Sequence, residues 1–286
     1  MFEILRKSLA TGVVTTPYPQ PPGAAATSCG RGRPQIDFAN WKDARPAAAA
    51  CPTGALACTN HAGTRTVLLD LGKCTFCGLC AEADPAIRMT NQCELAAPSR
   101  SALITSTQYQ LKPDGTHARL LNPGDSARNF PSTAAPALDA LGGQLKARIH
   151  KILGRSLHIR EVDAGSCNGC EIEIVGLNSP VYDIERFGIH FVASPRHADM
   201  LLVTGPVSRN MELALRKTYQ AMPEPRLVVA VGACGCSGGI FGQNYATLGG
   251  VDKVVPVNVY IPGCPPNPFA LLQGILTAIG RFEAQR

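Results

Sequence analysis

From residue 157 onward the sequence alternates short apolar runs with longer stretches in which apolar side chains recur every three or four positions. The first pattern predicts buried strands and the second predicts helices. Because parallel neighbours need crossover connections that bury both faces of a sheet, this alternation predicts an α/β fold, with a parallel sheet and helices on both faces. The expected strands are 157–162, 189–193, 200–204, 226–231 and 257–261. The expected helices are 171–187, 208–222 and 268–282.

The N-terminal part of the chain lacks this alternation. Residues 2–9 are apolar and basic, which predicts one or two helical turns lying either on a membrane interface or against this domain or a neighbour. Residues 17–50 are rich in Pro, Gly and Ala and are expected to be extended or irregular. A cysteine-rich unit follows, and then a segment rich in Ser, Thr, Pro, Gly and Asn that predicts a long irregular linker. The predicted division is a small domain at residues 1–97, a linker at 98–150 and the α/β domain at 151–286.

Composition narrows the function classes. The 27 Lys and Arg residues exceed the 21 Asp and Glu residues, but this excess is too dilute and too poor in aromatic residues for a nucleic-acid groove. A phospholipid surface or an acidic partner is the better expectation, with no nucleic acid. The chain is expected to be soluble, because no stretch approaches the roughly 18–20 apolar residues that span a bilayer. It has no apolar core followed by a small-residue cleavage site, so a cytoplasmic location is expected.

Cysteine usage points to metal chemistry. The chain has 12 cysteines, most of them in short-spaced groups. In the reducing cytoplasm such groups predict metal or cluster binding rather than disulfides. The Gly-rich loops lack the Lys and the Ser or Thr of a phosphate-binding loop, so nucleotide binding is not expected.

The first group is a C-x-x-C-x-x-C motif formed by Cys74, Cys77 and Cys80. This spacing lets three thiolates converge from one tight loop onto three corners of an iron-sulfur cube. In bacterial two-cluster ferredoxins the fourth ligand is a Cys followed by Pro from the other half of the sequence. Cys51, which precedes Pro52, supplies that element, so these four cysteines are the predicted ligands of a 4Fe-4S cluster.

The departures from the ferredoxin pattern agree with one another. Residues 41–50 lack a second C-x-x-C-x-x-C motif, and Asp84 stands before Pro85 where the other Cys-Pro is expected. All the ligands of one cube are missing, so the sequence predicts a small degenerate ferredoxin-like α+β domain with a single cluster. Two alternatives stay open: a zinc knuckle built from three or four of these thiols, and Cys58 or Cys29 in place of the fourth ligand.

Three segments of the first domain carry a family resemblance. Residues 71–80, the opening 2–12 with Tyr18 and Pro19, and residues 93–96 resemble the ferredoxin-type subunit of formate hydrogenlyase and hydrogenase-4 complexes. The likeness covers roughly residues 1–97. It implies an electron wire between another iron-sulfur subunit, acting as donor, and a hydrogenase core.

Four further cysteines stand in loops of the predicted α/β domain. Cys167 and Cys170 lie in a strand-to-helix loop with small residues, where a helix N-terminus offsets the negative charge of a cluster. Cys234 and Cys264 lie in Gly-rich and Pro-rich loops after later strands. Ligands bind outside the carboxyl ends of the strands in such sheets. The first loop supplies two thiolates and each of the other two loops supplies one. Four thiolates at this edge predict a second 4Fe-4S cluster.

At these residues the chain resembles the small-subunit family shared by nickel-iron hydrogenases and the quinone-adjacent iron-sulfur subunit of complex I. The likeness covers about residues 157–286 and implies a flavodoxin-like domain with Cys167, Cys170, Cys234 and Cys264 as ligands. Complex I subunits usually have two adjacent cysteines in the first motif, so the spacing here favours the hydrogenase side. Cys236 departs from the family pattern, and is either a spare buried thiol or a competitor of Cys234.

One acidic residue is a candidate for proton transfer. Glu171 follows the second ligand at a place where hydrogenase relatives carry a Glu implicated in passing protons. The alternative is that it simply begins a helix as a favourable first-turn charge.

Together these features predict an electron-transfer subunit with two 4Fe-4S clusters in a membrane-associated, energy-converting hydrogenase complex. The resemblance implies a nickel-iron large subunit as electron acceptor, integral membrane subunits as partners, and a peripheral place on the cytoplasmic side. The alternatives are a quinone-reducing subunit next to the large subunit of complex I, and a structural adaptor with zinc or vestigial clusters.

Overall fold

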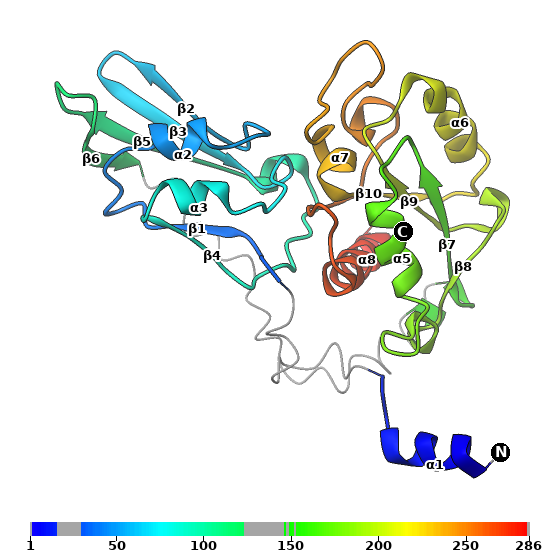
Figure 1. The fold of residues 1–286 in the computed structure, drawn as a ribbon. Coiled ribbons are helices and arrows are strands. Elements are labelled where there is room, and N and C mark those ends of the chain that lie inside the picture. The colour runs from blue at the N-terminus through cyan, green and yellow to red at the C-terminus, as the bar shows by residue number, and fades with distance from the viewer. Residues whose placement is uncertain (1, 16–29, 123–145, 147–148, 152, 285–286) are drawn as a thin grey trace.

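The computed structural model describes residues 2–15, 30–122, 146, 149–151 and 153–284. Two lobes lie side by side, the N-terminal one drawn in blue to blue-green and the C-terminal one in bright green to red (Figure 1). Helix α1 (Phe2–Thr11) stands apart from both lobes, and none of its residues is buried. In the described part of the chain, no helix is long and apolar enough to cross a membrane.

The C-terminal lobe is built on a parallel sheet of five strands in the order β11-β10-β9-β7-β8. This is the flavodoxin order, in which the chain runs outward from the first strand in both directions. Two of the inner strands, β9 and β10, are buried at every position, and all of their residues except Thr204 are apolar. The strands are β7 (Leu157–Asp163), β8 (Ile189–Phe191), β9 (Met200–Thr204), β10 (Leu227–Val231) and β11 (Val259–Ile261).

Helices cover both faces of this sheet, as the strand-helix alternation predicts. Alternate residues of β10 enter two separate core clusters. α6 (Arg209–Gln220) contributes to one cluster, and α5 (Gly169–Gly176) and α8 (Pro268–Ala284) contribute to the other. The short α7 (Gly232–Ser237) follows β10 directly. The expected α/β fold class is therefore confirmed.

One expected helix is wrong in length. The stretch 171–187 is not a single helix, because α5 ends at Gly176 and only the 3-10 turn Ile184–Phe187 resumes helical geometry. Gly176 is a poor helix former, and Pro180 excludes helical geometry from the residue before it. Two further 3-10 turns cover Pro195–His197 and Val251–Lys253.

The N-terminal lobe contains the predicted ferredoxin-like unit. Its elements follow the order β-α-β-β-α-β, with β1 paired to β4 and β2 paired to β3. Two of these elements fall in the stretch 17–50 that was expected to be irregular, and residues 16–29 lie outside the described part. The elements are β1 (Pro34–Ile36), α2 (Arg45–Ala49), β2 (Leu56–His61), β3 (Thr64–Asp70), α3 (Leu79–Ala83) and β4 (Ile87–Met89).

The expectation of an irregular linker over 98–150 is wrong for its first half. After the 3-10 turn Arg100–Leu103, the strands β5 (Ile104–Leu111) and β6 (His117–Asn122) extend the β2-β3 hairpin into a four-stranded sheet. Along β5 the side chains alternate between buried and exposed, but a threonine, Thr107, occupies one buried position. Because of this polar residue, the strand lacks the apolar alternation that predicts a strand from sequence. Residues 123–145 lie outside the described part.

The two lobes are joined by direct contacts. Ala97 and Tyr260 exchange two backbone hydrogen bonds of 2.9 Å, and the Ser237 hydroxyl donates to the Gly72 carbonyl at 2.9 Å. The amide of Ala96 donates to the side chain of Gln273 at 3.0 Å. Buried apolar side chains of both lobes belong to one core cluster. The division of the chain at residues 97 and 150 stays a prediction about folding units.

Candidate metal centres

Four thiols line one cavity in the N-terminal lobe. Cys51, Cys74, Cys77 and Cys80 all border a hollow of about 350 Å³, which includes space open to solvent. Cys51 comes just after α2, the next two stand in the loop from β3 to α3, and Cys80 belongs to α3. Gly78 allows the loop to turn into α3, because its φ of +90° suits glycine and few other residues.

The electrostatics of this cavity favour a bound cation. Burial raises the pKa of Cys74 to about 12, and the neighbouring thiols of Cys80, Cys51 and Cys77 add to the rise. Burial also raises the pKa of Cys80, with Cys51 and Cys77 contributing. Four thiolates held together therefore need positive charge beside them, which coordinated iron supplies.

The other described cysteines of this lobe, Cys58 and Cys93, do not border the thiol cavity. Cys58 pairs with Val67 inside the sheet and packs against the core. Cys93 lines a different cavity, near the lobe junction. Cys29 lies outside the described residues. Of the two rivals for the fourth position, the structure can place only Cys58, and it places it away from the three motif cysteines.

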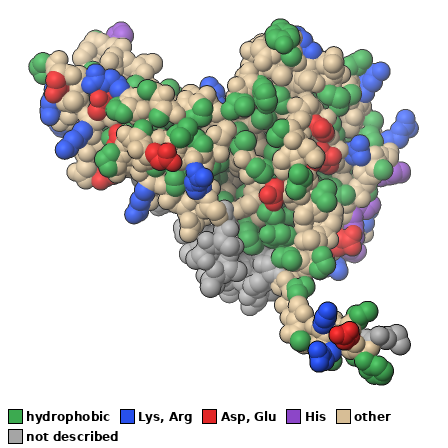
Figure 2. All heavy atoms as spheres, in the orientation of Figure 1, with side chains coloured by type: hydrophobic (Ala, Val, Ile, Leu, Met, Phe, Trp, Pro, Cys, Tyr) green, Lys and Arg blue, Asp and Glu red, His purple; other side chains and the backbone are tan. Residues whose placement is uncertain are grey.

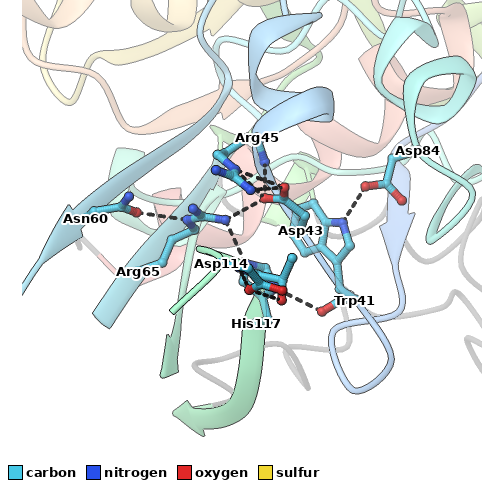
Figure 3. Close-up of polar contacts among 9 residues, drawn as sticks. Trp41, Asp43, Arg45, Asn60, Arg65, Asp84, Asp114 and His117 are labelled. Carbon is cyan, nitrogen blue, oxygen red and sulfur yellow. Dashed lines mark hydrogen bonds and ion pairs between the residues drawn. The ribbon is translucent and has the colours of Figure 1, made fainter. Parts of the chain in front are cut away.

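Side chains join the two segments in which the ferredoxin ligands are missing (Figure 3). Trp41, from the segment that lost its cysteines, is 3% exposed. Its indole Nε1 donates a 2.7 Å hydrogen bond to Asp84, the residue that replaces the expected Cys. The two places where ligands were lost are therefore in direct contact, and an aromatic ring and a carboxylate occupy the space between them.

A buried ion pair lies beside this tryptophan (Figure 3). Arg65 is fully buried and donates to Asp43 at 2.6 Å and to Asn60 at 2.9 Å. Burial tends to raise the pKa of Asp43, but hydrogen bonds from Arg45 and Arg65 outweigh it and lower the pKa to about 2. The carboxylate is therefore ionised at neutral pH and neutralises the buried guanidinium.

The second set of four cysteines gathers at the carboxyl ends of the parallel strands. Cys167 follows β7 and Cys170 begins α5, Cys234 lies in α7 directly after β10, and Cys264 follows β11. Burial raises the pKa of Cys170, and Glu171 and the other three thiols raise it further. Burial raises the pKa of Cys234 to about 11, with contributions from Cys264 and Cys167. These mutual effects require the four thiols to lie near one another.

Glycines make room for these thiols. A Cβ on Gly232 would lie 2.7 Å from the sulfur of Cys170, and a Cβ on Gly239 would lie 2.8 Å from the sulfur of Cys234. Both contacts are shorter than any that packed atoms tolerate. The glycines that the sequence places around these cysteines therefore serve the close approach of thiol and backbone.

Gly232→Ala is expected to empty the C-terminal site of this chain. The new methyl would displace the Cys170 thiol, and the φ of +80° at this position would strain any residue with a Cβ. Acid-labile sulfide in the reconstituted chain should fall from about eight to about four per chain. Gly176→Ala is the matched control, because nothing lies within 4 Å of its Cβ. Full sulfide content in Gly232→Ala would contradict this account of the loop.

Cys236 is separate from the ligand set. It is buried, and burial raises its pKa to about 12. Its thiol donates to the Ala230 carbonyl at 3.8 Å, and the charged groups that act on it most are Arg100, Asp70 and Asp252. Of the two roles considered for this residue, the structure favours a buried thiol over a competitor of Cys234.

Glu171 lies beside the second set, with an unexpected neighbour. Both of its carboxylate oxygens are buried without a hydrogen-bond partner in the structure, and so is Oε1 of Glu161 on β7. Burial raises the pKa of Glu161, and Glu171 is the next largest cause. The sequence pattern did not single out Glu161. It gave no clear signal, because β7 also carries the polar residues His158, Arg160 and Asp163.

A site for a single metal ion would need at least three His, Cys, Asp or Glu side chains arranged around one point. Among the described residues, no three His, Cys, Asp or Glu side chains are arranged to hold one.

A parallel sheet with cysteines at the carboxyl ends of its strands is typical of the small subunits of oxidoreductase complexes. Comparison with known proteins agrees: residues 167–278 match the family described as NADH ubiquinone oxidoreductase, 20 Kd subunit. The chain belongs to this family of oxidoreductase subunits.

Three relatives illustrate the range of the family. Formate hydrogenlyase subunit 7 of Escherichia coli is 48% identical over 166 residues, which cover 58% of this chain and 64% of the relative. The probable membrane-bound hydrogenase subunit mbhJ of Pyrococcus furiosus is 46% identical, over 48% of this chain and 81% of the relative. An NADH-quinone oxidoreductase subunit of Desulfovibrio desulfuricans is 48% identical, over 49% and 75%. The match to the first relative thus spans less than two thirds of its length.

Proposed function

We propose that this chain is an electron-transfer subunit that relays electrons through two 4Fe-4S clusters to a nickel-iron large subunit in a membrane-associated, energy-converting hydrogenase complex. The ligands of the first cluster are Cys51, Cys74, Cys77 and Cys80. The ligands of the second are Cys167, Cys170, Cys234 and Cys264. When bound, the clusters would accept and release single electrons.

The observation that carries the proposal is the gathering of thiols at two places in the fold. In the N-terminal lobe, four thiols border one cavity. In the C-terminal lobe, four thiols lie at the ligand edge of a parallel sheet, where neighbouring thiols add to the raised pKa of Cys170 and of Cys234. Thiolates gathered in this way need a compensating positive charge, which coordinated iron would supply.

The hydrogenase side of the family is favoured by the C-x-x-C spacing of Cys167 and Cys170. An exposed apolar surface beside the second thiol set supports docking of a large subunit there. Hydrophobic side chains gather on this lobe (Figure 2). The large exposed ones on α5 and just after α7 are Ile172, Val175, Ile240 and Phe241, at 63%, 68%, 62% and 50% exposure. Apolar area of this kind marks interaction sites on proteins.

Glu171 is proposed to hold and pass a proton at this interface. Its carboxylate oxygens are buried and unpaired in the structure, next to Cys170 in sequence. The alternative role, a favourable charge in the first turn of α5, is equally compatible with its place.

The proposed location is the cytoplasmic face of the cell membrane, peripheral and docked to integral membrane subunits. Helix α1 supports this location, because it offers an apolar surface for attachment that lies outside the two lobes. Its apolar side chains, among them Phe2 and Leu9 at 91% and 78% exposure, have no partner in the described chain, and it also carries Arg6 and Lys7. A membrane interface or a neighbouring subunit would cover this helix.

A second candidate function is quinone reduction in a complex I-like assembly. The similarity to the NADH-quinone oxidoreductase relative favours it, because this relative is as similar as the hydrogenase relatives. The C-x-x-C spacing and the ferredoxin-type N-terminal lobe favour the hydrogenase.

The two candidates differ in how the clusters become reduced. In the purified complex that contains this chain, hydrogen gas alone should produce the EPR signals of both reduced clusters. A quinone-reducing assembly would leave both clusters oxidised under hydrogen and reduce them only from its own donor, which would contradict the hydrogenase proposal. Zinc without acid-labile sulfide would support a structural adaptor instead.

A further inference from the structure

Phe76 lies between the two cysteine sites. It belongs to the C-x-x-C-x-x-C motif, one residue before Cys77, and lines the N-terminal thiol cavity. The same residue lines a second cavity of about 300 Å³, including space open to solvent. The far wall of this second cavity includes Gly263 and Pro265, the residues on either side of Cys264. Phe76 is thus shared by the cavity of one thiol set and the cavity beside the other.

The backbone of Phe76 is in an unfavourable conformation. Its φ is +54°, in the left-handed region that residues with bulky side chains rarely adopt and glycine adopts freely. Its amide points to the sulfur of Cys74 at 3.4 Å, and its side chain packs against the core cluster shared by both lobes. Strain of this kind persists where the surrounding structure enforces it, and it gathers at functional sites. A phenylalanine at a glycine-like position therefore indicates a use for its ring.

The position of this ring relative to both thiol sets is fixed. The loop before Cys74 is bonded to α7 through the Gly72 carbonyl and the Ser237 hydroxyl, at 2.9 Å. On the other side, β11 leads to Cys264 and is bonded to the N-terminal lobe through Tyr260 and Ala97. The loop before Cys74 and the loop that carries Cys264 are therefore held in place relative to each other.

We propose that Phe76 is the bridging residue for electron transfer between the two clusters, an inference that rests on the proposed function. With both clusters bound, one electron would pass from the N-terminal cluster to the C-terminal cluster, oxidising the first and reducing the second by one equivalent. No bond forms and no proton moves. Electron tunnelling weakens steeply with distance, and it weakens faster across empty or water-filled space than across packed atoms. The ring of Phe76 supplies those atoms and keeps water out of the gap.

The test compares two variants of the full chain with both clusters in place. Phe76→Gly removes the ring and relieves the backbone strain, and Phe76→Leu keeps an apolar side chain of smaller reach. A light-triggered reductant delivers one electron per chain, and freeze-quenched EPR follows its redistribution between the clusters. The rate in Phe76→Gly should fall roughly tenfold or more, with a smaller fall in Phe76→Leu. Iron and sulfide content should stay unchanged, and the EPR signals of both clusters should be retained.

Phe38→Leu is the matched control. Phe38 packs against the same core cluster and against Trp41, and it lines neither cavity, so its replacement should leave the rate unchanged. An unchanged rate in both Phe76 variants would overturn the inference. So would loss of a cluster signal in both, because the residue would then act only on the fold. A wild-type chain without two clusters contradicts the proposed function itself, and the unmutated sample shows this first.

Discussion

Replacing Cys51 by serine is expected to abolish or alter the EPR signal of the N-terminal cluster while the C-terminal signal survives. Cys51 borders the cavity of the motif cysteines. Its thiol is one of the groups that raise the pKa of Cys74 and of Cys80. Without it the cube lacks its fourth thiolate. Iron in the reconstituted chain should fall from about eight to about four per chain if the cluster is lost.

Cys58→Ser is the control for this experiment. Its thiol is partly buried in the same lobe, but the residue pairs within the β2-β3 hairpin and does not border the cavity. It should retain both signals and full iron content. If Cys58→Ser loses the N-terminal signal and Cys51→Ser keeps it, the ligand assignment is wrong.

Asp43→Asn is expected to lower the free energy of unfolding by about 3–5 kcal/mol, because it leaves a buried charge without its counterion. Arg65 has a side-chain exposure of 0%, and its 2.6 Å contact with Asp43 is its only ion pair in the described structure. One of its nitrogens, Nη2, already lacks a hydrogen-bond partner there. Anaerobic urea unfolding of the full chain measures the change.

Two further variants test whether the loss of stability comes from this ion pair and not from the removal of any acidic group. Glu82→Gln removes an exposed acidic group from the first turn of α3 and should cost less than about 1 kcal/mol. The double variant Asp43→Leu with Arg65→Met removes both buried charges and should recover most of the loss. A cost below about 1 kcal/mol for Asp43→Asn would mean that the pair does not stabilise the lobe.

The parallel sheet could be predicted because its strands carry their own signal. The expected strand 200–204 matches β9, and the expected strand 226–231 differs from β10 by one residue, since uninterrupted apolar runs of this length fit only buried strands. The strand β5 was missed because Thr107 stands at a buried position, where the fold tolerates a polar side chain that a sequence pattern does not anticipate. The end of α5 was missed because a single glycine, Gly176, is a weaker signal for the end of a helix than the surrounding apolar periodicity is for its continuation.

The candidate sites followed from chemistry that is local in sequence. Short cysteine spacings and the carboxyl ends of parallel strands were enough to select both thiol sets. The contact between Trp41 and Asp84 could not be predicted, since it joins residues 43 apart in the chain. The bridging place of Phe76 was missed for a similar reason: it depends on how the two lobes meet, which no motif encodes.

The central claim is that this chain holds two 4Fe-4S clusters at two separate sets of four cysteines. Anaerobic reconstitution of the full chain, followed by iron and acid-labile sulfide analysis and EPR after reduction, tests it most directly. The account predicts about eight iron and eight sulfide per chain, with one signal lost in Cys77→Ser and the other in Cys170→Ser. Zinc without sulfide, or a single signal that disappears in both variants, would contradict it.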